Sequence, residues 1–252
     1  MGEGTISVPA LPEHYELPPH TRDWDMPPAL FLRVVKEQGG IPIQVTSDKG
    51  TETGRLAAIQ TMLRQTFQPH LDSQILPPHV FVKSTYNITR ERAWRPLWEK
   101  EMANVLESWR LGKDDSGYHP EDPIHHGIAL WLWAKIVQVR LDRVRYEQNT
   151  HHIRKQRKVR LPTGGKPQDF YDHPEDYGGR KQLIQIPDMS LVDRLLAEYT
   201  PEKLFQFGSD ETVALAEQLF EAIGCPALSA SQGWAVFKAM ISVLDVMIHS
   251  RT

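Results

Sequence analysis

The feature that most constrains the fold of this chain is a short stretch in which a strand pattern ends at a carboxylate. Over residues 41–45 apolar side chains alternate with polar or small ones, which is the period of a half-buried strand. The strand is predicted to end at Asp48, because a Lys-Gly pair follows directly and favours a turn. A helix is predicted over residues 54–67, where apolar residues recur at helical spacing. Open α/β sheets place ligands at the carboxyl ends of their strands, although Asp48 also fits a role that only shapes the turn.

Composition and periodicity divide the chain into four ranges. In order, these are a proline-rich disordered leader at 1–27, a mixed α/β domain at 28–160, a linker at 161–185 and a helical region at 186–252. Within the α/β domain, a second strand is predicted at 79–84, followed by long helices at 84–110 and 124–148. The predicted fold class is therefore α/β, with a helical region at its C-terminal side.

The residue composition restricts the chemistry that is open to the chain. Cys225 is the single cysteine, which excludes an internal disulfide framework and a cysteine-based zinc site within one chain. The most apolar run, residues 128–139, is interrupted by Lys135 and is too short to span a bilayer. We therefore expect a soluble, intracellular protein with no membrane partner.

A second acid stands in a position related to that of Asp48. Glu91 lies in the first turns of the helix predicted at 84–110, at the head of an apolar stripe that is made of Trp94, Trp98, Met102, Val105 and Trp109. Asp48 ends a strand, and Glu91 begins the helix that follows the next strand. Both places can lie at one end of a compact sheet, so the two carboxylates are expected within about 10 Å of each other. Such a pair suits Mg²⁺ or Mn²⁺, which can activate the attacking oxygen in phosphodiester chemistry. The alternative is that Glu91 only favours its helix N-terminus electrostatically.

Three blocks of the chain resemble the catalytic core of DDE integrases and transposases, most closely the integrase core domains that are abundant in fungal genomes. Residues 41–54 are similar to the block that carries the family's second aspartate. Residues 84–95 are similar to its third-acid block, with an Asn near the helix start, Glu91 four residues later, and then Trp-Arg. Downstream, Asn-x-His-His-Ile-Arg-Lys and Leu-Pro-x-Gly-Gly-x-Pro also look like family segments, so that the resemblance spans residues 28–179.

The resemblance implies an RNase H-like sheet and metal-dependent DNA nicking and strand transfer. It implies Asp48 and Glu91 as catalytic metal ligands, Mg²⁺ or Mn²⁺ as cofactor, DNA as partner and a nuclear location, and it leaves a homo-oligomer open. One departure is that the family's first catalytic aspartate lies on an earlier strand, whereas only 47 residues precede Asp48 here. Asp23 and Asp25 stand beside prolines without a strand pattern, so the first strands of the sheet are expected to be missing.

Three hypotheses follow from the resemblance and this departure. The chain is an incomplete copy of such an enzyme, a non-catalytic remnant that binds nucleic acid or protein, or an unrelated soluble α/β protein. An upstream segment that supplies a strand with an aspartate would favour the enzyme.

A basic segment, residues 140–160, is the candidate for contact with nucleic acid. Residues 135–166 hold ten Lys and Arg against two acids, a net charge of +8 in a chain whose formal charge is -3. The predicted phosphate-binding residues are Arg154, Lys155, Arg157, Lys158 and Arg160. The alternative is a solvated helix face. The paired histidines at 125–126 and 151–152 are expected to be surface or capping residues, because the cysteine partners of an integrase-type zinc module are absent from the sequence.

Overall fold

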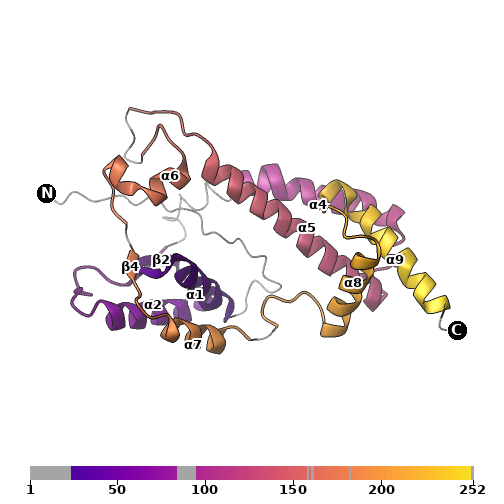
Figure 1. Cartoon of the computed structure of the whole chain (residues 1–252), viewed down its shortest axis with the longest axis horizontal. Helices are drawn as coiled ribbons and strands as arrows, with labels where there is room; N and C mark the ends of the chain where they lie inside the picture. The colour runs from indigo at the N-terminus through magenta and orange to yellow at the C-terminus, as the bar shows by residue number, and fades with distance from the viewer. Residues whose placement is uncertain are drawn as a thin grey trace. The chain divides into compact units, whose positions relative to one another are not determined.

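The computed structural model describes residues 24–83, 95–157, 159, 162–181, 183–201 and 203–250. The chain is a mixed α/β protein in which helices predominate, as the sequence predicted (Figure 1). It divides into two compact units. Among the described residues, the first unit holds 24–83 and 144–204 and the second holds 95–143 and 205–250.

Three helices build the core of the first unit. Helix α1 (Met26–Gln38) has prolines in its first turn and ends where Gly39 adopts a left-handed conformation (φ 64°), which a glycine tolerates without steric cost. Helix α2 (Gly54–Phe67) has the predicted bounds. Helix α7 (Ser190–Tyr199) packs against α1, and Lys36 Nζ lies 2.7 Å from Asp193 Oδ1 between them. The buried side chains of this core are Leu32, Val35, Ile41, Ile59, Leu63, Ile186, Val192 and Leu195.

The strand predicted over 41–48 is two strands with different partners, and the prediction of one continuous strand was wrong. Strand β1 (Gly40–Pro42) pairs antiparallel with β4 (Leu183–Gln185), whereas β2 (Val45–Asp48) pairs parallel with β3 (His79–Val82). Pro42 has no backbone N–H to donate to a ladder, which explains why the first pairing ends there. Each of these two sheets consists of two strands among the described residues. The sheet formed by the described residues is therefore smaller than the expected RNase H-like sheet.

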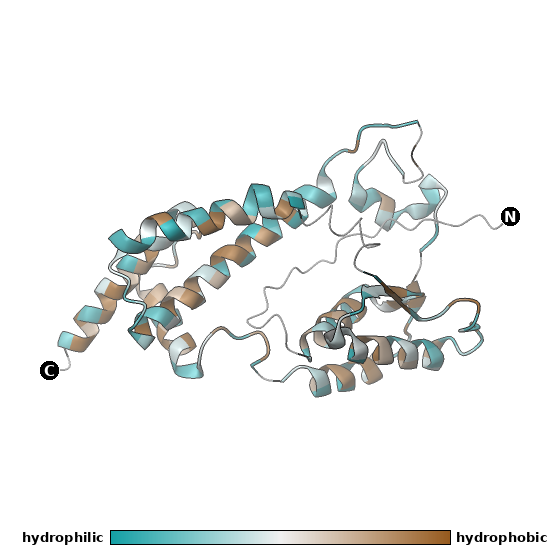
Figure 2. Cartoon of the chain, turned by 180° about the vertical axis from the view of Figure 1, so that it is seen from behind, coloured by the Kyte–Doolittle hydropathy of each residue, from teal (hydrophilic) through white to brown (hydrophobic). Residues whose placement is uncertain are grey.

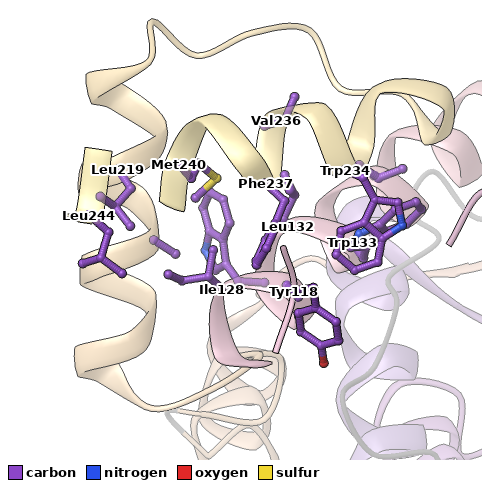
Figure 3. Packing of buried hydrophobic residues seen from close by; sticks show 14 of the residues in the cluster. Tyr118, Ile128, Leu132, Trp133, Leu219, Trp234, Val236, Phe237, Met240 and Leu244 are labelled. Atoms are coloured by element: carbon purple, nitrogen blue, oxygen red, sulfur yellow. The ribbon is translucent and has the colours of Figure 1, made fainter. Parts of the chain in front are cut away.

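Among the described residues, four helices build the second unit around an aromatic core. They are α4 (Ala103–Lys113), the long helix α5 (Pro123–Thr150), which continues past this unit, α8 (Asp210–Ala222) and α9 (Gly233–His249). Figure 3 shows side chains of this core packed between α5, α8 and α9. Trp109, Trp133 and Trp234 are neighbours in it, and Trp234 Nε1 donates a 2.8 Å hydrogen bond to the backbone oxygen of Trp109.

The apolar stripe predicted on the helix at 84–110 is confirmed only in part. Met102, Val105 and Trp109 belong to the core, but Trp98 is 58% exposed. The segment Trp98–Met102 is a π-helical turn directly before α4, and its wider turn rotates Trp98 out of phase with the residues that follow. Trp94, like Glu91, lies outside the described residues.

The predicted C-terminal helical region contributes to both units. Helix α7 belongs to the first, whereas α8 and α9 belong to the second. By length and composition, residues 230–249 are apolar enough to cross a membrane, and Figure 2 shows hydrophobic residues along α9. Phe237, Met240 and Leu244 of this helix are buried in the core, a position that accounts for the same composition.

Short elements connect these helices and strands. Helix α6 (Pro167–Asp172) lies in the range predicted as a linker. The described residues include four single 3₁₀ turns, η1 (Thr51–Thr53), η4 (Asp114–Ser116), η5 (Pro174–Tyr177) and η6 (Ala230–Gln232).

Candidate functional site

Asp48 is the last residue of β2 and lies at the carboxyl end of a parallel strand pair. It stands opposite Val82 of β3 in the register, and α2 connects the two strands. Its side chain is exposed. Thr53 Oγ1 lies 3.3 Å from the backbone oxygen of Asp48 and donates to that of Gly50 at 2.8 Å, so the turn after the strand is held from within. This is the place in an α/β unit where a carboxylate can meet a ligand.

A buried arginine on α2 holds the starts of the two parallel strands. The Arg64 side chain is 1% exposed, and its guanidinium donates to the backbone oxygens of Ile43, at 3.0 Å, and Leu76. It also donates to Ser73 Oγ at 3.2 Å. Ile43 precedes β2 and Leu76 precedes β3. One side chain therefore holds the backbone before both strands, which fixes their register at the point where the pairing begins. Burial lowers the pKa of Arg64, yet no described carboxylate pairs with it.

A histidine and a serine contact each other across the strand pair. Ser47 Oγ lies 3.2 Å from His79 Nε2, and the imidazole ring is tilted by 58° against the ring of Phe81, with centroids 4.4 Å apart. His79 Nδ1 is buried without a hydrogen-bond partner among the described residues. Burial lowers the pKa of His79, so the neutral ring is favoured in the folded protein.

Of the two predicted metal ligands, Asp48 and Glu91, the structure describes only Asp48. Glu91 lies outside the described residues, so its distance to Asp48 stays a prediction. Among the residues that the structure describes, no group of three or more His, Cys, Asp or Glu is arranged to hold a metal ion. A divalent cation takes several oxygen ligands, and Asp48 by itself supplies one carboxylate.

The first arginines of the predicted basic segment interact with other residues of the protein. Arg140 lies on α5 and forms an ion pair with Glu101, and its Nε donates to Glu101 Oε2 at 2.5 Å. Arg143 and Arg145 also take part in interactions. Helix α5 ends at Thr150, so the described residues that follow directly, 151–157, do not form a solvated helix face.

Between α5 and α6 two described segments, residues 153–157 and 162–165, lie side by side (Figure 1), and we call the range 153–165 the basic arm. Its two sides join where Ile153 N donates to the Gly165 oxygen at 2.8 Å and Gly164 N donates to the Ile153 oxygen at 2.9 Å. Farther along, Gln156 N donates to Thr163 Oγ1 at 3.0 Å.

The described cations of the arm point into solvent. Arg154, Lys155 and Arg157 are exposed, and none forms an ion pair with a described residue. Lys158 and Arg160 lie outside the described residues. Of the predicted phosphate-binding set, three side chains are therefore placed together on one arm.

Two aromatic rings, which were not predicted from the sequence, pack against the base of the arm at Gly165. A Cβ on Gly165 would stand 2.7 Å from Phe170 Cε1 and 3.1 Å from the Tyr177 hydroxyl, so only a glycine fits there. The two rings meet edge to face at 4.6 Å. The sequence signal was the Gly-Gly pair with aromatic residues five and twelve positions after its second glycine.

The first pair of histidines has hydrogen-bonding roles at the start of α5. His126 Nδ1 bonds the Tyr118 hydroxyl at 2.9 Å, and His125 Nδ1 accepts from the backbone N–H of His119. Asp122 Oδ1 accepts from the N–H groups of Ile124 and His125, and the Ile124 bond is the main cause that lowers the pKa of Asp122. The side chain that caps the start of α5 is therefore Asp122 and neither histidine, whereas His126 is exposed, as predicted for a surface residue.

No protein-family model matches this chain, and no curated protein or solved structure matches it either. Its function has to be inferred from its own residues and their arrangement.

Proposed function

We propose that this chain is an integrase- and transposase-like protein of mobile-element origin that binds DNA. The observation that carries the proposal is the β2–α2–β3 unit, in which a parallel crossover leaves Asp48 exposed at the carboxyl end of its strand. The Asp48 block, the Glu91 block and the Leu-Pro-x-Gly-Gly-x-Pro segment also follow one another in the order of the family that they resemble.

The ancestral chemistry of such a protein is phosphodiester strand transfer with Mg²⁺ or Mn²⁺. Asp48 and Glu91 are the residues that would hold the ion, which when bound activates the attacking oxygen and stabilises the leaving one. A third acid on a neighbouring strand is not assigned within these 252 residues. The proposed present activity is therefore binding, with catalysis incomplete in these residues alone.

A non-catalytic, nucleic-acid-binding role is the second candidate, and the basic arm favours it. Arg154, Lys155 and Arg157 are exposed without acidic partners among the described residues, which is the state in which cations neutralise phosphates and release counterions. Both candidates require DNA binding, and they differ in whether Asp48 contributes.

DNA binding is tested by titrating a labelled duplex at several salt concentrations. Replacing Arg154, Lys155, Arg157 and Lys158 with Gln removes up to four phosphate contacts and should flatten the salt slope by roughly three to four units. Asp48→Asn should leave affinity unchanged or slightly higher, because it removes a negative charge.

A control, one charge smaller than the arm variant, replaces three exposed cations of the second unit, Lys100, Arg110 and Lys238, with Gln. It should change the slope much less than the arm variant does. Equal slopes for wild type and arm variant, or equal losses in arm variant and control, would refute the proposal.

A further inference from the structure

We propose that two copies of this chain pair through the exposed face of α9, with the two helices antiparallel about a two-fold axis at Ser242. The proposal goes beyond the DNA binding proposed above and does not depend on it. Helix α9 (Gly233–His249) lies outside residues 28–179, so the resemblance to integrases implies nothing about this surface.

Helix α9 has two faces, and the core of the second unit uses one of them. Phe237 and Met240 pack into that core (Figure 3). On the opposite side, five exposed or half-buried residues follow one another at steps of four, three, four and three positions. We call them the α9 seam: Ala235, Ala239, Ser242, Val246 and His249. Steps of four and three keep one line of side chains against a partner helix in a coiled coil. The exposed face of α9 therefore has the spacing of a helix-pairing surface.

The α9 seam exposes apolar surface, and the hydroxyl at its middle is already satisfied. Val246, the largest apolar side chain of the seam, is 68% exposed, and Figure 2 shows hydrophobic residues along the helix. Ser242 donates from Oγ to the backbone oxygen of Lys238 at 2.9 Å. Because this hydrogen bond lies within the helix, a partner can cover the hydroxyl without breaking it. Covering the seam therefore removes apolar surface from water at little polar cost.

The charges beside the seam favour a second copy of the same helix as the partner. Lys238 and Asp245 lie seven residues apart on one flank of the seam, so they share one side of the helix. Both are exposed, and neither forms an ion pair with a described residue. In an antiparallel pair about a two-fold axis at Ser242, each flank meets the same flank of the other copy. Lys238 of each protomer then lies beside Asp245 of the other.

A parallel pair would bring like charges together. Lys238 would lie beside Lys238 and Asp245 beside Asp245, and like charges at an interface disfavour that arrangement. The antiparallel arrangement forms two opposite-charge pairs instead. These exposed charges set the partner and the orientation, whereas the apolar seam supplies the affinity.

The opposite flank of the seam agrees with the same axis. About a two-fold axis at Ser242, Val246 of one protomer meets Ala239 of the other, so a large apolar side chain lies opposite a small one. Ala235 meets His249 at the two ends of the seam. One axis thus satisfies both flanks, as the isologous interface of a two-fold dimer requires.

Sedimentation velocity of the full chain over a concentration series measures the dimer, which has twice the chain mass of 28.9 kDa. Asp245→Lys places a lysine opposite Lys238 in both pairs and should raise the dimer Kd about tenfold or more. Adding Lys238→Asp to that variant restores two opposite-charge pairs and should return the Kd to within about threefold of wild type. Glu107→Lys makes the same change of charge at an exposed position of α4 and should leave the Kd unchanged.

Oxidative cross-linking measures the orientation of the helices. In a Cys225→Ser background, Ser242→Cys places a thiol at the two-fold axis, where it can form a disulfide with its counterpart. Ala235→Cys lies seven residues from the axis, so the two thiols would be about 21 Å apart along the helices. That distance is too long for a disulfide, whose Cα atoms are at most about 7 Å apart. Only Ser242→Cys should therefore cross-link.

Three results would each overturn the proposal. They are a chain that stays monomeric at every concentration, a dimer that Asp245→Lys leaves intact, and disulfide formation by both cysteine variants, which would indicate a parallel pair. A monomer that binds phosphatidylcholine vesicles, and loses that binding in Val246→Asp, would also overturn it and assign the face to a lipid surface. The near-ultraviolet signal of the tryptophans shows that each variant is folded.

The dimer and the proposed DNA binding fail independently. Phosphate contacts of the basic arm are counted by the salt slope, which does not require a dimer. The control variant of the DNA titration lacks Lys238, so its sedimentation is measured in the same series and should show a weaker dimer than wild type.

Discussion

At the residue scale, the β2–β3 pair is contacted by the buried Arg64 and the half-buried His79, and neither has a charged partner among the described residues. Arg64 satisfies its guanidinium with two backbone oxygens and one hydroxyl. His79 satisfies only Nε2, through Ser47, and leaves Nδ1 without a partner among the described residues. Because an unpaired buried group costs free energy when it becomes charged, His79 is the residue through which pH should act on this unit.

Stability of the first unit is predicted to fall as the solution is acidified, and His79 is the cause. Its pKa is lowered in the folded state from the ordinary value of 6.5, so the unfolded chain binds a proton first. The contribution is fully present above pH 6.5 and is lost as the pH falls from there toward the lower folded-state pKa. Urea unfolding of wild type and His79→Gln at several pH values measures it.

The variant should lose less stability on acidification than wild type does. His70→Gln removes a histidine that is exposed and should track wild type. If His79→Gln shows the same acid dependence as wild type, another group carries the effect and the assignment to His79 is wrong.

The sequence predicted the position of Asp48 in its strand, but it could not predict the hydrogen bonds of Arg64. Alternation and a Lys-Gly turn placed Asp48 at the end of a strand, where the structure has it. The same helical spacing that located α2 gave no sign that Arg64 is buried, because a long polar side chain is expected at the surface. Its three acceptors come from segments nine to twenty-one residues away, which no local pattern encodes.

At the element scale, the helices of the second unit approach one another at glycines. A Cβ on Gly112 of α4 would lie 2.3 Å from Trp234 Cδ1 of α9, and one on Gly127 of α5 would lie 2.5 Å from Thr212 Cγ2 of α8. Helix bounds were predicted well from apolar period and stop signals, since α2 and α5 begin and end within two residues of the expected positions. Which helices touch was not predicted, because a glycine inside a helix pattern only signals lower helix propensity.

Gly112→Ala is predicted to destabilise the second unit even though alanine favours helix formation. The alanine gains about 1 kcal/mol in helix propensity, but overpacking against a buried ring typically costs about 1–3 kcal/mol. The net effect should be a lower melting temperature and a changed near-ultraviolet signal from the tryptophans. Gly54→Ala is the matched control, because its added Cβ is unobstructed and should be neutral or stabilising. A Gly112→Ala protein as stable as wild type would show that α4 and α9 are not pressed together there.

At the scale of the whole molecule, the chain keeps its two cores separate and its excess positive charge local. Unit one has the core around Leu32 and Leu63, and unit two has the tryptophan core. The +8 of residues 135–166 is balanced elsewhere by about -11, so the DNA binding that we propose would rest on a local charge and not on the net charge of the chain. The sequence located this segment but not the arm, because no local pattern encodes the pairing of residues 153 and 165 or the close approach of Gly165 to Phe170 and Tyr177.

The whole 252-residue chain is predicted to bind DNA without cutting it. Strand transfer by two metal ions needs enough carboxylates to hold both ions, and the chain offers Asp48 and Glu91 without an assigned third acid. Purified protein incubated with a labelled duplex and Mg²⁺ or Mn²⁺ should yield no nicked or joined product at concentrations that saturate binding. Asp48→Asn protein prepared in the same way controls for contaminating nucleases, since a contaminant would act in both samples. Cleavage by wild type that disappears in Asp48→Asn would contradict the prediction and would mean that another acid of this chain completes the site.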